Sequence, residues 1–139
     1  GNCALDLFWY LNSPRLAKVP NCDAHIDRGL LHALVASPVN GFEMLDVTAN
    51  AFRAPQDMCT QNLIPLRDVL VIVNHELQLV SHSSRWPSDW PRLQACVHRV
   101  AKPPSCEPRL SISYEIRTAC TVPLSSVLPD VQTECASDN

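Results

Sequence analysis

The sequence predicts an α+β fold in which one helix packs on an antiparallel β-sheet and disulfide bonds stabilise the domain. Three observations lead to this prediction. Apolar residues recur at near-helical spacing in the first third of the chain, they alternate with polar residues from 109 to 122, and seven of the 139 residues are cysteine. Because a helical pattern comes first and strand patterns follow it, we expect a helix and a sheet in separate layers.

Two segments of the first half have the spacing of an amphipathic helix, and we expect one of them to be the main helix. Residues 23–36 begin with Asp23, which can cap a helix, and then place apolar side chains at near-helical intervals. Residues 41–52 repeat large apolar side chains every three or four positions. Residues 5–11 contain a Phe-Trp-Tyr group, which predicts a short helix or an apolar plug in the core.

The second half has the two-residue period of β-strands. Residues 109–122 alternate apolar with polar side chains, with one exception at Ala119, and this predicts a strand with one buried face. Residues 68–80 are rich in β-branched side chains and predict a second strand that pairs with the first, although a helix over 65–82 is an alternative. Residues 92–101 predict a shorter strand.

Length and composition indicate one globular domain over residues 1–139, with residues 1–40 as an N-terminal extension or first helix. The chain is 46% hydrophobic and 18% charged, which is ordinary for a soluble fold. A net charge of −3 with scattered basic residues gives no reason to expect nucleic-acid binding. No apolar run approaches the roughly 20 residues of a membrane-spanning helix, so we expect no membrane insertion.

The cysteines predict a secreted or extracellular protein. No pair has the Cys-x-x-Cys spacing of a zinc site, so disulfide bonds explain the cysteine content better than a metal does. Structural disulfides persist in oxidising compartments. Because seven is an odd number, one thiol is left over, and a disulfide-linked dimer through that cysteine is one possible use of it.

The last four cysteines carry a resemblance to the cystatin superfamily, which includes cathelicidin pro-domains and fetuin-type domains. The resemblance covers about residues 41–139 and is supported by Val73-Asn74, Pro103-Pro104 and Val122-Pro123. It implies bonds between the first and second and between the third and fourth members of the set Cys96, Cys106, Cys120 and Cys135.

The same resemblance implies a domain that binds another protein, either a receptor or a protease. Inhibitory cystatins carry a Gln-x-Val-x-Gly segment and a Trp, whereas this chain has neither Gln nor Gly over 68–72 and has Leu124 at the Trp position. We therefore expect a non-inhibitory cystatin-like domain. The alternatives are an all-α, short-chain four-helix cytokine with residues 63–81 as a core helix, a cysteine-protease inhibitor and, last, a small secreted hydrolase.

No group of residues predicts catalysis, so we expect no enzyme, no catalytic residue and no cofactor. Asp23, His25 and Asp27 could suggest a metal site, but on a helix they fan over about 200° and could converge only on a strand. We therefore expect no metal ligands. The other histidines are dispersed without motif partners, and the chain has only three glycines, too few for a phosphate-binding loop.

The best candidate for a binding surface is a proline-stiffened loop that contains two tryptophans. Trp and Arg dominate the binding energy of many protein interfaces, and a stiff loop loses little entropy on docking. The alternative is that the indoles fold back onto the core. The predicted binding residues are Arg85, Trp86, Trp90 and Arg92.

Overall fold

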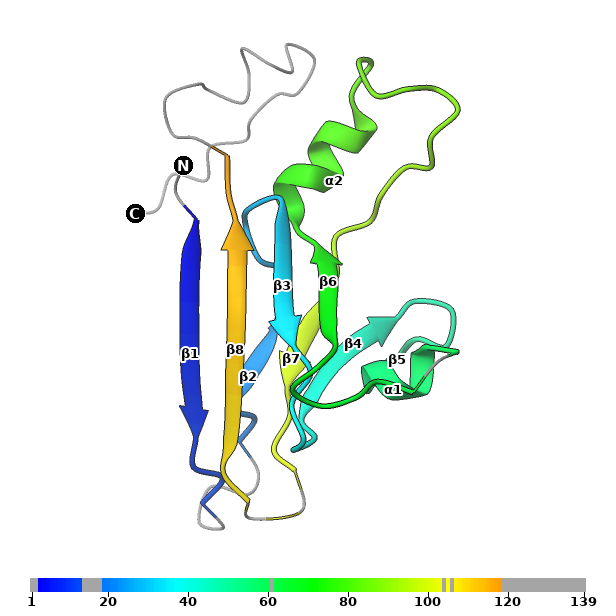
Figure 1. Cartoon of the computed structure of the whole chain (residues 1–139). Coiled ribbons are helices and arrows are strands. Elements are labelled where there is room, and N and C mark those ends of the chain that lie inside the picture. The colour runs from blue at the N-terminus through cyan, green and yellow to red at the C-terminus, as the bar shows by residue number, and fades with distance from the viewer. Residues whose placement is uncertain (1–2, 14–18, 61, 104, 106, 119–139) are drawn as a thin grey trace, which may run out of the picture.

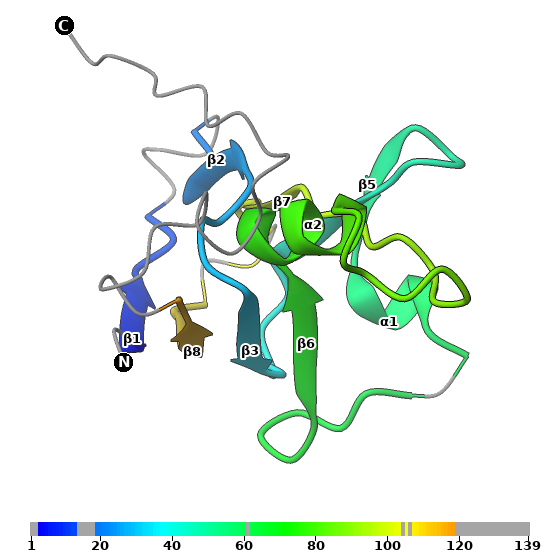
Figure 2. The ribbon, with the colours of Figure 1, turned by 90° about the horizontal axis from the view of Figure 1, so that it is seen from above.

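Two four-stranded antiparallel sheets face each other in the computed structural model, which describes residues 3–13, 19–60, 62–103, 105 and 107–118 (Figures 1 and 2). We call them sheet 1 and sheet 2. Sheet 1 has the order β1-β8-β3-β6, with the strands β1 (Ala4–Tyr10), β8 (Arg109–Ile116), β3 (Leu31–Val35) and β6 (Val69–Val73). Sheet 2 has the order β2-β7-β4-β5, with the strands β2 (Cys22–His25), β7 (His98–Val100), β4 (Phe42–Asp46) and β5 (Ala51–Arg53).

Helices play a small part in this arrangement. The described residues form α1 (Pro55–Met58) and α2 (His75–His82), and Figure 1 shows α2 at the end of the sheets where β6 finishes. The α+β prediction is therefore wrong, and so is the four-helix alternative, because two sheets pack on each other without a helix lying across either. None of the helices in the described part of the chain is long and apolar enough to cross a membrane.

Both predicted N-terminal helices are strands. Residues 23–36 form the end of β2 and all of β3, whose apolar side chains lie on both faces and so imitate helical spacing. Residues 41–52 form the β4–β5 hairpin, in which Asp46 Oδ1 accepts hydrogen bonds from the Thr48 and Ala49 amides and closes the turn. The segment predicted as a short helix or core plug is β1.

The strand predictions of the second half are partly correct. The alternating segment forms β8, but β8 pairs with β1 and β3, and β6 lies on the far side of β3, so the predicted pairing with residues 68–80 is wrong. The segment 68–80 divides at Asn74 into the strand β6 and the helix α2, so the strand prediction and the helix alternative are each correct for one part of it. Of the strand predicted over 92–101, only His98–Val100 is extended in a sheet.

The apolar core lies between the sheets and consists of Leu34, Phe42, Ile72 and Val100. Beside it, the inward face of β8 is polar, because its buried side chains are Arg109, Ser111, Ser113 and Glu115. The apolar side chains of β8 belong to the opposite face, where Leu110 and Tyr114 are exposed. The interior of the molecule therefore contains a polar strip next to its core.

Disulfide bonds do not stabilise the described part of the chain. Cys3, Cys22, Cys59 and Cys96 are free thiols, so the Cys96–Cys106 bond that the cystatin resemblance implied is not formed. Cys106, Cys120, Cys135 and the segment around residues 122–124 lie outside the described residues. Without that bond and without a helix across a sheet, the two main structural features of the resemblance are missing.

Candidate metal centre

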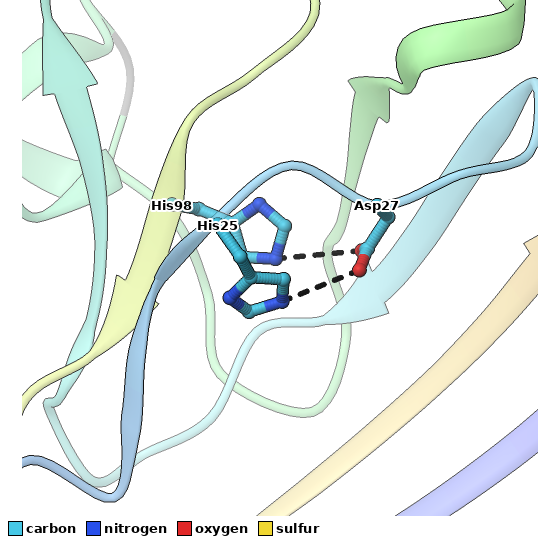
Figure 3. Close-up of side chains that lie close together, drawn as sticks. All are labelled: His25, Asp27 and His98. Atoms are coloured by element: carbon cyan, nitrogen blue, oxygen red, sulfur yellow. Dashed lines mark ion pairs between the residues drawn. The ribbon is translucent and has the colours of Figure 1, made fainter. Parts of the chain in front are cut away.

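His25, Asp27 and His98 converge where β2 meets β7 (Figure 3). Their ligating atoms all lie within 4.8 Å of one another. His25 Nε2 is 3.3 Å from Asp27 Oδ1, and His98 Nε2 is 3.4 Å from Asp27 Oδ2. The His98 side chain is buried and Asp27 is half-buried, whereas the His25 side chain is 39% exposed, so the cluster opens on the His25 side.

Strand pairing brings these three side chains together. His25 and His98 are directly paired between β2 and β7, and their ring centroids are 4.4 Å apart. Asp27 follows His25 by two positions, and side chains two apart on extended backbone point to the same side. The Asp27 carbonyl accepts a 3.0 Å hydrogen bond from the His75 amide, which ties the turn after β2 to the start of α2.

Gly29 allows this turn to lie close to sheet 1. Its φ of +42° lies in the left-handed region, which glycine adopts without strain. A Cβ atom there would lie 2.7 Å from Glu115 Oε1 and 2.9 Å from the Ile116 carbonyl oxygen. Any larger residue would push the Asp27 turn away from β8, so the position of the carboxylate depends on this glycine.

The electrostatics of the cluster suit cation binding. Burial acts to raise the pKa of Asp27, but the hydrogen bond from His32 and the nearby imidazoles outweigh burial and lower the pKa below its usual value. Burial lowers the pKa of His98 despite the opposing effects of the Cys96 carbonyl and Asp27. An ionised carboxylate beside a neutral imidazole is the protonation state that metal binding requires.

Two imidazoles and one carboxylate form the donor set of mononuclear non-haem Fe(II) sites. Thiols lie nearby, since Cys22 Sγ is 3.6 Å from His25 Nδ1. Burial raises the pKa of Cys22, and burial together with the Asp27 charge raises the pKa of Cys96 to about 11. These cysteines are therefore neutral thiols at neutral pH, and nitrogen and oxygen remain as the donors.

A cavity of about 200 Å³ lies beside the core, lined by Leu34, Phe42 and Arg109 among others. Phe42 connects it to the cluster, because its ring also packs against the His98 ring at 5.4 Å between centroids. The buried Arg109 guanidinium donates from Nε to the Val39 carbonyl at 3.2 Å and lies 5.8 Å from the centre of the Tyr10 ring. Its Nη1 has no hydrogen-bond partner although it is buried.

A buried guanidinium nitrogen without a partner is a costly arrangement unless a ligand completes it. Burial lowers the pKa of Arg109, while Tyr10 acts in the opposite direction, and an arginine remains charged in proteins. A positively charged side chain therefore lines the cavity, and a guanidinium is the group that suits a small anion such as a carboxylate.

The predicted binding loop lies after α2, and its residues are not part of this cluster. Trp86 and Trp90 pack edge to face at 5.4 Å, and the Trp86 indole donates to the Pro91 carbonyl at 3.3 Å. Trp90 is 55% exposed, whereas Arg92 donates to the carbonyls of Ser81 and Ser83. Arg85 is exposed. A binding role for this loop stays a prediction, as do the protein partner and the extracellular location.

Sequence reasoning considered two of the three cluster residues and set them aside. It placed His25 and Asp27 on a helix, where they diverge, but His25 ends β2 and Asp27 lies in the turn just after it, where both side chains reach the same site. The His-x-Asp spacing at the end of a strand was the sequence feature that could have predicted these two candidate ligands. His98 carries no local signal, because only the pairing of β2 with β7 brings it to the site.

No family model matches the chain, and no curated protein matches its sequence. Solved structures do match. The dioxygenase for auxin oxidation from rice is 24% identical over 85% of this chain and 35% of that chain, with a TM-score of 0.61. The corresponding Arabidopsis thaliana enzyme, in complex with 2-oxoglutarate, is 20% identical over 95% of this chain and 44% of that chain, with a TM-score of 0.64. A Caulobacter crescentus protein described as a 2OG-Fe(II) oxygenase family protein is 24% identical over 86% of this chain and 34% of that chain, with a TM-score of 0.64.

These likenesses establish the fold as the double-sheet, jelly-roll-like fold of 2-oxoglutarate dioxygenase structures, and the chain spans less than half the length of each of them. They overturn the cystatin resemblance, since no cystatin is among these neighbours. They also overturn the expectation of a non-enzymatic, cystatin-like binding domain, because these neighbours include dioxygenases.

Proposed function

We propose that the chain carries the iron centre of an Fe(II)- and 2-oxoglutarate-dependent oxygenase. The observation that carries this proposal is the convergence of His25, Asp27 and His98 within 4.8 Å. Two imidazoles and one carboxylate leave coordination positions open for a co-substrate, and this donor set is typical of Fe(II) oxygenases. The fold neighbours whose names include 2-oxoglutarate or Fe(II) support the same assignment.

The cavity beside the cluster suits the co-substrate. 2-Oxoglutarate is a small dicarboxylate, Arg109 lines the cavity, and its buried Nη1 is a donor that has no partner within the described part of the chain. Ser111 is buried two positions farther along the inward face of β8, and we propose that its hydroxyl binds the same carboxylate. One end of the ligand would bind Arg109, and the other end would lie toward Phe42 and His98.

When bound together, Fe(II) and 2-oxoglutarate supply the oxidising chemistry that inserts oxygen from O₂ into a C–H bond of a substrate. The residues of this chain bind and orient the participants. His25 and His98 would supply nitrogen donors to the metal, Asp27 would supply the negative charge, and Arg109 would bind the distal carboxylate. Phe42 and Leu34 give the cavity an apolar wall.

Anaerobic titration tests this assignment. The chain is expected to bind one Fe(II) per molecule by calorimetry and then to bind 2-oxoglutarate with the appearance of a visible charge-transfer band. His98→Ala should weaken metal binding beyond the roughly 10–100-fold effect of an outer-shell change, because it removes a ligand. His82→Ala is the matched control, since His82 is exposed on α2 and should leave both titrations unchanged.

Two results would contradict the proposal. One is the absence of stoichiometric Fe(II) binding by the folded wild-type chain. The other is equal metal affinity in His98→Ala and the wild-type chain, which would mean that the metal binds elsewhere. Circular dichroism of each variant establishes that its sheets are intact before the titrations are compared.

A further inference from the structure

A fourth histidine contacts the cluster from sheet 1. His32 lies on β3 and is 9% exposed. Its Nδ1 is 2.5 Å from Asp27 Oδ2, a distance that indicates a strong, charge-assisted hydrogen bond. Its Nε2 is also buried and has no hydrogen-bond partner. The ring is therefore joined to the cluster through a single nitrogen.

The hydrogen-bond pattern fixes which nitrogen carries the proton. An ionised carboxylate only accepts, so Nδ1 of His32 must be the donor to Asp27. A proton on Nε2 would be a buried donor without an acceptor, which is costly. Across the strands, His32 is paired with Glu115 on β8 and Ile72 on β6, and Glu115 is engaged by Arg117. Asp27 is thus the carboxylate that accepts the hydrogen bond of His32.

We propose that His32 is a positioning residue of the metal centre, an inference that rests on the proposed function. By donating from Nδ1 to Oδ2, it occupies one carboxylate oxygen of Asp27 and leaves Oδ1, the oxygen 3.3 Å from His25 Nε2, free for a cation. The carboxylate is thereby held in one orientation and presents one oxygen to the metal. The bond also links sheet 1 to the turn after β2.

His32 is not itself a ligand in this arrangement. The group of atoms that lie within 4.8 Å of one another contains His25, Asp27 and His98 but not His32. The Nδ1 atom that faces the cluster is already bonded to Asp27, and a metal ligand whose oxygen is held in this way binds more tightly than a freely rotating one. Filling space in the core is the competing role, and it would not depend on Nδ1.

Three substitutions separate these roles. His32→Leu keeps apolar volume and removes the donor, and it should weaken binding of Mn(II) or Co(II) by about 10–100-fold in calorimetric titrations. His32→Asn places an amide nitrogen near the position of Nδ1 and should recover most of that affinity. His32→Gln places its amide nitrogen near the position of Nε2 and should not. His82→Leu is the control for loss of a histidine.

The outcomes are distinguishable from failure of the proposed function. If the wild-type chain binds no metal, the proposed function fails and this inference fails with it. If the wild-type chain binds metal and His32→Leu binds it equally well, or if Gln restores affinity as well as Asn does, only the positioning role of His32 is overturned.

Two further measurements complete the test. Thermal unfolding of the metal-free variants reports the packing effect separately. If His32→Leu fails to fold, the metal affinities of His32→Asn and His32→Gln still test whether the Nδ1 donor is needed. The Co(II) absorption bands should keep their positions and intensities in the Asn variant. A change in them that indicates loss of one nitrogen ligand would show His32 to be a direct ligand and would overturn its assignment as a positioning residue.

Discussion

The inward face of sheet 1 combines apolar core residues with buried polar side chains, whereas its outward face exposes large apolar ones. The face toward sheet 2 buries a polar group consisting of His32, Arg109, Ser111, Ser113 and Glu115. The other face exposes large apolar side chains, among them Leu5, Leu7, Trp9, Val69, Val71, Leu110 and Tyr114. A sheet with one solvated face normally turns its apolar side chains inward.

Hydrophobicity therefore accounts for only part of the burial in this sheet, since the inward face contains Leu34 and Ile72 of the core as well as the polar group. Among the inward polar side chains, Arg109 lines the cavity and His32 contacts Asp27 of the cluster. The outward apolar side chains form the kind of patch that marks an interaction surface when it is larger than a few isolated residues. The following predictions test whether the two faces contribute differently to stability, binding and surface behaviour.

The largest effect is expected from a matched pair of leucine truncations on this sheet. Leu34 faces inward and is 6% exposed, whereas Leu7 faces outward and is 65% exposed. Leu34→Ala should lower the free energy of unfolding by about 2–5 kcal/mol, because it leaves a void in the core. Leu7→Ala should change it by about 0.5 kcal/mol or less. Urea denaturation of both variants measures the difference, and equal losses would mean that the outer face is covered by packing.

Arg109→Met tests whether the inner polar face serves binding more than stability. The change removes a buried charge with an unpaired nitrogen, so the free energy of unfolding should stay within about 1 kcal/mol of the wild-type value. Binding of 2-oxoglutarate to the metal-loaded chain should weaken by about 10–100-fold, as expected for loss of a hydrogen bond to a charged group. A large loss of stability with unchanged 2-oxoglutarate affinity would assign Arg109 a structural role.

Val71→Thr tests the outer face with a change of nearly equal shape. Val71 lies within the apolar group, where Ala33 of β3 is its paired neighbour, whereas Val47 is an isolated exposed valine in the β4–β5 turn. Val71→Thr should reduce fluorescence of an apolar dye bound to the native protein, and Val47→Thr should not. Equal effects of the two changes would show that the outer face does not act as a continuous patch.

The smallest effect is expected from a carboxylate that belongs to neither face. Hydrogen bonds from the Ala49 amide and from Arg53 lower the pKa of Asp46 below its ordinary value of 3.8. Because the folded pKa is the lower one, this stabilisation is complete above pH 3.8 and is lost as the pH falls from there through the folded pKa. In thermal melts, Asp46→Asn should be less stable than the wild-type chain at neutral pH. The difference in stability should shrink as the pH falls below 3.8. A constant difference would exclude ionisation as the cause.

Local patterns predicted some elements and could not predict the faces. The alternation of β8 identified a strand, because a two-residue period is independent of what covers each side. It could not show that the polar side is the buried one, which depends on the site built between the sheets. For β3, apolar side chains on both faces gave a false helical period. Seven cysteines suggested disulfides, yet composition alone cannot tell a free, partly buried thiol such as Cys96 from a disulfide-bonded one.

The site itself was predictable only in part. His25 and Asp27 are neighbours in the sequence, so their spacing could be recognised once the local backbone was known to be extended. His98, His32 and Arg109 come from three other strands, and only the sheet topology brings them near this pair. Arg109 lies on β8, whose alternating pattern was interpreted from its apolar residues. The polar residues of that strand, including Arg109, are the ones that face inward.

The short pairing between β2 and β7 has a consequence for folding. Only Cys22 with Val100 and His25 with His98 are paired in register between these strands, and a bulge separates the two pairs. An ion held by His25 and His98 would act as a cross-link between segments far apart in the sequence. Since the unfolded chain does not hold these ligands together, metal at 100 times its dissociation constant would add about 2.7 kcal/mol to the stability of the folded state. Supply of the metal would then affect how much folded protein persists, in addition to any effect on function.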